Sequence, residues 1–208
     1  MYSLIAKQTL RDRKKEATAS ALAEAAFELA LEKGLDGFVV DDVVQQAGYS
    51  RRTFANYFSC KEEAVAAVAV PTTSVEEYEK LLAGLPQAAT PLDVLYSLMQ
   101  MQFTAEFLLK IRKFISLSKQ YPTLEPYILG VFRRLQMAAQ EALEPFAHGR
   151  YKDGYTHLLV GAVYGAFVPI LDGGLNVLLP GETEAEPTDA IPFDQYLNSM
   201  FEYLRKGF

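Results

Sequence analysis

Apolar residues recur every three or four positions through most of this chain, which is the spacing of amphipathic helices. Between residues 12 and 33, Leu22, Ala26 and Leu29 mark one apolar face, and Gly34 follows as a helix-ending glycine. Similar patterns predict later helices over residues 61–70, 74–82, 90–109, 111–119, 128–146, 153–171 and 192–204. The chain is therefore predicted to be all-α.

Residues 40–63 predict two short helices that meet across a tight turn. Asp41 and Asp42 put carboxylates against the positive end of the first helix, and Gly48 suits the left-handed conformation that ends it. The Ser50 hydroxyl can cap the second helix. A turn of about three residues between two such helices is typical of a helix-turn-helix.

The second of these helices has one apolar face and one polar face. Phe54 and Phe58 lie four residues apart and can anchor it. Guanidinium groups suit guanine edges and phosphates, an Asn amide suits adenine, and a Thr methyl suits the thymine methyl. The outward set is Arg51, Arg52, Thr53, Asn56 and Tyr57. On this pattern alone, a small apolar helix pair with solvated arginines remains the alternative.

A third short helix is expected directly after this pair. Ser59 and Glu62 form a capping-box pattern, and Lys61 falls in the first turn. The helix dipole disfavours a cation there, so we expect an outside anion near Lys61.

The charge is unevenly distributed along the 208 residues. The formal net charge is −6, but residues 1–20 carry a local +3 from Lys7, Arg11, Arg13, Lys14 and Lys15 against Asp12 and Glu16. A basic arm beside a reading helix fits binding to phosphates, and a solvated terminus is the alternative.

The composition indicates a cytoplasmic protein without a membrane segment. The N-terminus lacks the order of a signal peptide, and the longest apolar run, residues 158–171, is too short to span a bilayer. A single cysteine excludes an internal disulfide, and neither CxxC nor HExxH spacing occurs. We expect no metal and no cofactor.

The run AGYSRRTFANYFSCKEEAV, after a long helix ending in EKG, resembles the DNA-binding domain of the TetR family of bacterial repressors. The resemblance covers about the first 65 residues. It implies a helix-turn-helix domain over residues 1–63 and a helical ligand-binding and dimerisation domain over residues 64–208. It also implies a homodimeric repressor that binds a palindromic operator in double-stranded DNA and is released by a small apolar or aromatic ligand. The expected DNA-binding residues are Arg11, Lys14, Ser50, Arg51, Arg52, Thr53, Asn56, Tyr57 and Lys61.

Two positions depart from the family pattern. The family usually has a Thr at the position of Val39 and an aromatic residue, commonly Tyr, at the position of Ala55. Both family residues often contact phosphate, so binding here should be weaker or anchored elsewhere, for example on Tyr57, which takes the place of a family His. The alternative is a ligand-binding sensor dimer with weak or lost DNA binding.

The helix predicted over residues 90–109 is apolar nearly all round, so most of its surface must be buried. The resemblance implies that flexible Met and aromatic side chains line a ligand cavity there, and plain core packing is the alternative. The candidate ligand-binding residues are Tyr96, Met99, Phe103, Phe107, Phe132 and Tyr164.

Two later segments favour association with another helix. Gly161 and Gly165 put small residues on one side of a very apolar helix, so that a second helix can approach closely. The short last helix has so broad an apolar face that it needs a partner. The resemblance implies a four-helix bundle between two subunits.

The sequence offers little for catalysis, and we expect no enzyme. Asp153, which can also cap the helix after it, and His157 stand four residues apart, where a structural contact is favoured over an acid-base pair. Cys60 lies near a helix start, and a redox sensor built on one cysteine is the weaker interpretation. Arg133 and Arg134 fit a solvated face better than a site for an acidic ligand.

Overall fold

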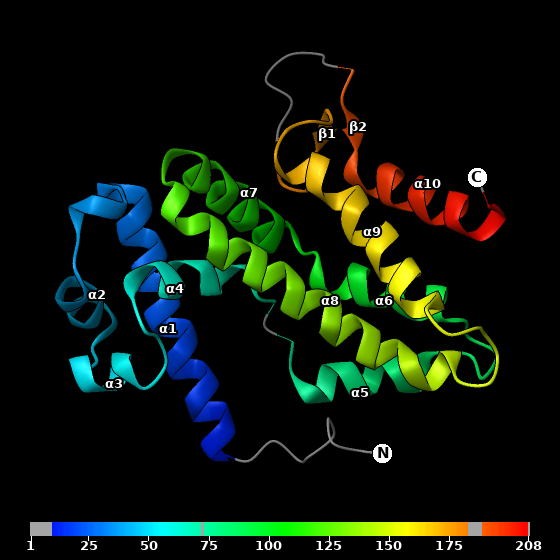
Figure 1. Ribbon diagram of the computed structural model, residues 1–208, viewed down its shortest axis with the longest axis horizontal. Helices are drawn as coiled ribbons and strands as arrows, with labels where there is room; N and C mark the ends of the chain where they lie inside the picture. The colour runs from blue at the N-terminus through cyan, green and yellow to red at the C-terminus, as the bar shows by residue number, and fades with distance from the viewer. Residues whose placement is uncertain (1–9, 72, 183–188, 208) are drawn as a thin grey trace. The chain divides into compact units, whose positions relative to one another are not determined.

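The computed structural model describes residues 10–71, 73–182 and 189–207. Lys7 of the basic arm and part of the acidic loop, residues 183–188, lie outside the described residues. The prediction of an all-α fold is confirmed, since the described strands are only the parallel two-residue pair β1 (Val177–Leu178) and β2 (Ile191–Pro192). The α-helices are α1 (Leu10–Lys33), α2 (Val40–Ala47), α3 (Arg51–Ala55), α4 (Lys61–Ala66), α5 (Val75–Gly84), α6 (Pro91–Gln102), α7 (Ala105–Gln120), α8 (Glu125–Ala147), α9 (Tyr155–Leu171) and α10 (Phe193–Lys206) (Figure 1). Short 3-10 turns are η1 (Leu35–Gly37), η2 (Ala67–Ala69) and η3 (Pro122–Leu124).

The described residues group by their contacts into two compact units. The first unit holds the residues up to Val75 together with Lys113–Phe132, and the second holds Glu76–Arg112 together with the residues from Arg133 onward. The domain boundary that we expect after residue 63 remains a prediction.

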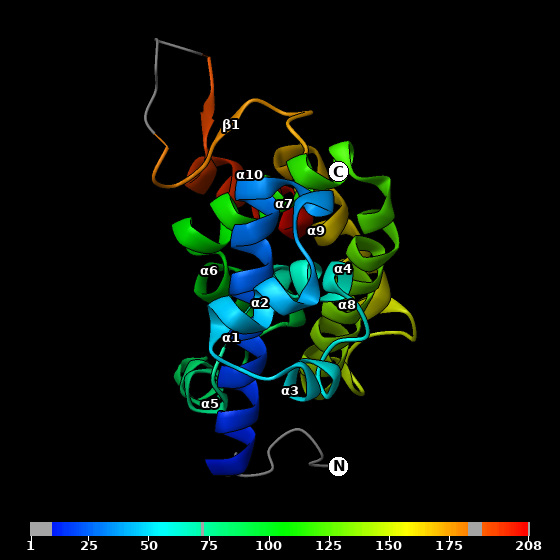
Figure 2. The same cartoon turned by 90° about the vertical axis from the view of Figure 1, so that its left-hand side faces the viewer.

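The first unit is built on α1, against which α2 and α4 pack (Figure 2). Leu22 and Ala26 on α1 have no exposed surface, and neither do Val43 of α2 and Val65 of α4. Alanine-rich helices lose little side-chain entropy, and removal of these apolar side chains from water holds the three helices together. The helix predicted from residue 12 therefore has the expected face and the expected end.

The start of α4 differs by one residue from the expected capping box. Cys60 is the N-cap, because its Sγ accepts a hydrogen bond from the Glu63 amide at 3.4 Å. The acidic side chain at this helix start is Glu63 rather than Glu62, because Glu63 Oε2 accepts from the amide and the hydroxyl of Ser59, the residue before the N-cap, both at 2.7 Å. The helix begins at Lys61, one residue later than Ser59 as the N-cap would place it, and Lys61 stays in the first turn as expected.

In the second unit, the apolar run of residues 90–109 is two helices rather than one. Its start is as expected, with Pro91 first and the Thr90 hydroxyl accepting from the Asp93 amide at 3.2 Å. The chain then leaves the helix at Phe103 (φ −88°, ψ 61°), and the Thr104 hydroxyl accepts from the Phe107 amide at 3.2 Å. Thr104 thus starts α7, which continues without a break to Gln120.

The predicted cap of α9 is wrong. The N-cap is Gly154, with φ 86°, and Asp153 makes no capping hydrogen bond. Asp153 is one residue too early, because the left-handed glycine separates it from the first turn.

Two helices of the second unit present different surfaces. The apolar face of α10 packs within its own unit, where Leu197 and Phe201 are buried. By contrast, Leu158 of α9 is 74% exposed, and a Cβ built at Gly161 or Gly165 would meet no atom of another described element within 4 Å. An apolar side chain and two small residues are therefore left open on α9.

Candidate nucleic-acid interface

The turn between α2 and α3 is fixed by the two residues that the sequence indicates. Gly48 ends α2 in the left-handed conformation (φ 73°, ψ 30°). Ser50 begins α3, where its hydroxyl accepts from the Thr53 amide at 3.0 Å and lies 2.8 Å from the Thr53 hydroxyl. Phe54 and Phe58 anchor the buried side, with ring centroids 5.6 Å apart. Because α3 ends at Ala55, Asn56 and Tyr57 lie in the turn that follows it.

The two arginines at the start of α3 have different surroundings. Arg51 Nε lies 2.8 Å from Asp41 Oδ1, in an exposed ion pair between α3 and α2. Arg52 is exposed and makes no ion pair with a described residue. Exposed pairs of this kind contribute about 0–1 kcal/mol, so DNA can compete for Arg51 at small cost.

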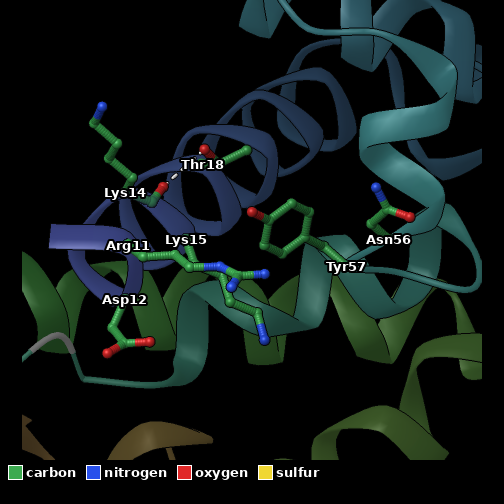
Figure 3. A pocket seen from close by; sticks show the side chains of 7 residues that line it. All are labelled: Arg11, Asp12, Lys14, Lys15, Thr18, Asn56 and Tyr57. Carbon is green, nitrogen blue, oxygen red and sulfur yellow. Dashed lines mark hydrogen bonds between the residues drawn. The ribbon is translucent and has the colours of Figure 1, made fainter. Parts of the chain in front are cut away.

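A basic cleft of about 780 Å³ lies between α1 and the turn after α3 (Figure 3). Three of its side chains are basic and one is acidic, and they come from the first turns of α1, while an amide and a phenol come from the other side. The Thr18 hydroxyl donates to the Lys14 carbonyl at 2.8 Å and so stays on the helix. The lining residues are Arg11, Asp12, Lys14, Lys15, Thr18, Asn56 and Tyr57.

This basic cleft joins residues about 40 positions apart in the sequence. Arg11, Lys14, Asn56 and Tyr57 are all among the residues expected to bind DNA. Lys15 belongs to the basic arm that the sequence indicates, whereas Thr18 was not expected there, although the helical spacing of Lys14 and Thr18 places both on one side of α1. Cationic side chains beside a phenol and an amide form a surface suited to phosphate oxygens.

Lys61 has partners within the chain. Its Nζ donates to the carbonyl oxygens of Leu35 at 2.7 Å and Phe38 at 2.9 Å, and it lies 5.0 Å from the centre of the Phe38 ring. The ammonium group therefore closes the connector between α1 and α2. The expected contact of Lys61 with an anion remains a prediction, now in competition with these carbonyls.

At the start of α2 the Asp42 carboxylate binds the backbone amide of Val39, whose own side chain cannot cap the helix. The Val39 side chain is 57% exposed, and its amide donates to Asp42 Oδ2 at 2.7 Å. The helix is thus held on one side without the hydroxyl that a Thr would supply. Ala55 is exposed and adds no polar group.

The candidate ligand-binding residues are divided between the two units. Phe132 belongs to the first unit and the other five to the second. Met99 and Tyr164 are buried, with 1% and 7% exposure. Phe103 packs edge-to-face on Phe167, at 4.6 Å between centroids. Tyr96 donates to Asn198 Oδ1 at 2.6 Å. Their role in binding a ligand stays a prediction.

The pair considered for catalysis is exposed. Asp153 and His157 are both exposed, and neither side chain makes a hydrogen bond with another described residue. Among residues 10–71, 73–182 and 189–207 there is no group of three His, Cys, Asp or Glu side chains that could hold a metal. In the same residues no helix is both long and apolar enough to cross a membrane.

Two sequence comparisons match part of the chain. Residues 22–68 match the sequence model of the bacterial regulatory proteins of the tetR family. A stretch of 74 residues is 36% identical to the uncharacterized HTH-type transcriptional regulator YvdT of Bacillus subtilis (strain 168), and this alignment covers 35% of our chain and 38% of that protein.

Two solved structures resemble the chain over most of its length at low identity. A regulator of the TetR/AcrR family from Thermobifida fusca YX-ER1 is 17% identical, with a TM-score of 0.42 over 92% of this chain and 98% of that one. A HlyIIR mutant protein is 18% identical, with a TM-score of 0.34 over 90% and 97% of the two chains.

Proposed function

From the membership of this chain in the TetR family of transcriptional regulators, we infer that it binds double-stranded DNA through α3 and the basic cleft. The observation that carries the proposal is the meeting of Arg11, Lys14 and Lys15 with Asn56 and Tyr57 beside the outward face of α3. It puts a surface for phosphates next to residues that can read bases, which is the division of labour found in protein–DNA interfaces.

In the proposed complex the N-terminal residues of α3 enter the major groove. Arg52 is free for a guanine edge, Arg51 reaches DNA by leaving Asp41, and the Thr53 methyl suits a thymine. Ser50 positions this helix start through its bond to the Thr53 amide. The residues of the basic cleft bind the neighbouring phosphates. Because bacterial DNA lies in the cytoplasm, this function would place the protein there.

The functional unit that we propose is a homodimer on a palindromic operator. The open face of α9 supports it, since Leu158 is 74% exposed, Val168 is 43% exposed, and no other element of the described chain comes within 4 Å of a Cβ built at Gly161 or Gly165. An identical α9 related by a two-fold axis can pack there, because the small residues allow close approach. Two copies of α3 then read half-sites about one turn of DNA apart.

We further propose that the protein is a repressor that a small apolar or aromatic ligand releases from its operator. The aromatic side chains in the second unit support this, since Phe103 contacts both Phe107 and Phe167. A ligand that binds the DNA-free form more tightly must lower operator affinity by the same factor.

A gel shift with the DNA upstream of the gene for this protein tests DNA binding directly. We expect a complex that a shuffled duplex of equal length does not compete away, and we expect Arg51→Ala with Arg52→Ala to weaken it. Lys152→Ala with Lys206→Ala is the matched control, because it removes equal charge from the second unit. Equal binding by both double variants would remove α3 as the reading element.

A ligand-binding dimer with weak or lost DNA binding is the second candidate. Its support is that Val39 is 57% exposed without a hydroxyl and that Ala55 is exposed without an aromatic ring. Val39→Thr with Ala55→Tyr separates the two functions. If the wild type binds its upstream DNA only nonspecifically while this variant binds it specifically, the sensor is the better description.

A further inference from the structure

Arg112 of α7 lies at the centre of a polar cluster in the second unit. Its Nη1 donates to both carboxylate oxygens of Glu182, at 2.6 and 2.7 Å. Its Nη2 donates to the carbonyl oxygens of Ile170 and Val177, each at 3.2 Å. Both charged side chains are mostly covered, with 29% exposure for Arg112 and 26% for Glu182. The guanidinium is thus held in place by two backbone groups and by one carboxylate.

The contact between Arg112 and Glu182 uses only part of what the guanidinium offers. A carboxylate fits a guanidinium best as a fork, with its two oxygens on two different nitrogens. Here both oxygens share Nη1, while Nε is buried and makes no hydrogen bond with any described residue. The Nε–H of Arg112 is therefore an unpaired donor. A carboxylate that replaced Glu182 and bound Nη1 and Nε together would pair it.

Glu182 is presented by a turn that packs on one face of α7. The Leu179 amide donates to Glu182 Oε2 at 2.9 Å, and the Glu182 amide donates to the Leu179 carbonyl at 3.1 Å. A Cβ built on Gly181 would lie 3.6 Å from Ala105 and 3.8 Å from Leu109. Ala105, Leu109 and Arg112 share a face of α7. The Leu179–Glu182 turn therefore packs on Ala105 and Leu109, and the ion pair with Arg112 holds it at the end of this face.

Aromatic rings lie on the two helices that hold the arginine in place. Phe107 belongs to α7 like Arg112, and Phe167 belongs to α9 like Ile170. Phe103 joins them, at 6.0 Å from Phe107 and 4.6 Å from Phe167 between ring centroids. Aromatic side chains and the arginine therefore come from the same two helices of the second unit.

We propose that Arg112 is the receptor for the carboxylate of the ligand, a monocarboxylate with an apolar or aromatic body, and that Glu182 occupies this receptor in the free protein. The inference rests on the proposed response to a ligand and names its chemical class. Glu182 belongs to the same chain as Arg112, so its effective concentration at the guanidinium is high. A ligand displaces it only if the added hydrogen bond to Nε and the burial of the ligand's apolar body stabilise the complex more. Binding then releases the Leu179–Glu182 turn from α7.

Chemical rescue tests whether the receptor accepts an external carboxylate. Glu182→Ala removes a group equivalent to acetate and should lower the melting temperature. Acetate should restore about 2–4 °C of the loss in a saturable manner, whereas acetamide and chloride should not. The same titration on Glu182→Ala with Arg112→Gln should give no rescue. Equal effects of acetate and acetamide, or equal rescue without Arg112, would overturn the proposal.

Hydrogen exchange on Glu182→Gln and Arg112→Gln covers the case in which Glu182→Ala does not fold. The Leu179 amide should exchange at least several-fold faster in both variants than in the wild type, and unchanged protection would contradict the proposal. Both readouts are made without DNA. A failed rescue therefore leaves operator binding as proposed, and a failed gel shift leaves the carboxylate receptor intact.

Discussion

The thiol of Cys60 lies 3.0 Å from the phenol oxygen of Tyr127. The same sulfur accepts the hydrogen bond from the Glu63 amide that begins α4. One side chain thus caps a helix and joins it to the first turns of α8, and both residues belong to the first unit. The hydrogen bond with Cys60, with smaller effects from Glu62 and Glu63, raises the pKa of Tyr127 to about 12.

Cys60→Ala should lower the free energy of unfolding by about 1 kcal/mol, because α4 loses its N-cap. Cys60→Ser is the matched control, since its hydroxyl can accept from the Glu63 amide and reach Tyr127. Urea unfolding followed by circular dichroism gives both values. If the alanine and serine variants unfold at the same urea concentration, the sulfur is not a cap that matters to stability.

Removal of a charge from the basic cleft should weaken DNA binding without changing its sequence preference. Lys14→Ala and Lys15→Ala should each reduce the slope of log affinity against log salt by about 1, because each lysine releases counterions from a phosphate. Fluorescence anisotropy with the operator and with a shuffled duplex measures both quantities. Lys152→Ala is the control, and a slope equal to that of the wild type in both cleft variants would exclude this cleft from the interface.

Gly161→Leu should convert the proposed dimer into a monomer that is still folded. Among the described residues, no atom outside the neighbouring backbone of α9 lies within 4 Å of the added Cβ, so we expect the new side chain to clash with a second α9. Sedimentation velocity should show about half the mass, and operator affinity should fall with it. Gly84→Leu serves as the control, because a Cβ added there also meets no atom of another described element within 4 Å. A variant that remains dimeric places the interface elsewhere.

Stability should fall as the pH rises from 10 to 12, in part because of Tyr164. Burial raises the pKa of Tyr164 to about 12, from an ordinary value near 10. Within this range the unfolded chain has lost the phenol proton and the folded chain retains it, so unfolding is favoured as the pH rises. The contribution is complete below pH 10 and amounts to about 2–3 kcal/mol. Tyr164→Phe should show a correspondingly flatter fall in urea stability, while Tyr127 titrates in both proteins. Parallel curves would contradict the assignment.

The helix-turn-helix could be predicted because its signals are local. Gly48 and Ser50 act on the backbone within three residues of themselves, and Thr90 acts on Asp93 in the same way. The break at Phe103 gave no such signal, since the apolar run continues across it and only the Thr104 hydroxyl decides where α7 starts. A hydroxyl inside an apolar run is compatible with either outcome.

Contacts between distant segments could not be predicted from any local pattern. Arg112 and Glu182 are 70 residues apart, and neither residue stands in a motif. Most residues of the basic cleft could be predicted, but the cleft itself could not. The resemblance indicated Asn56 and Tyr57, and the local charge indicated Arg11 and Lys14. Their meeting depends on how α1 packs against α2 and α4, which a single sequence does not specify.

The ion pair between Arg51 and Asp41 has a consequence for the speed at which the protein finds its site. In the proposed complex the Asp41 carboxylate competes with DNA phosphates for the Arg51 guanidinium at every encounter, at a cost of about 0–1 kcal/mol. We expect this competition to shorten the dwell time on nonspecific DNA, where no base contact compensates for the lost ion pair. Asp41→Asn should therefore slow the search by prolonging every unproductive stop.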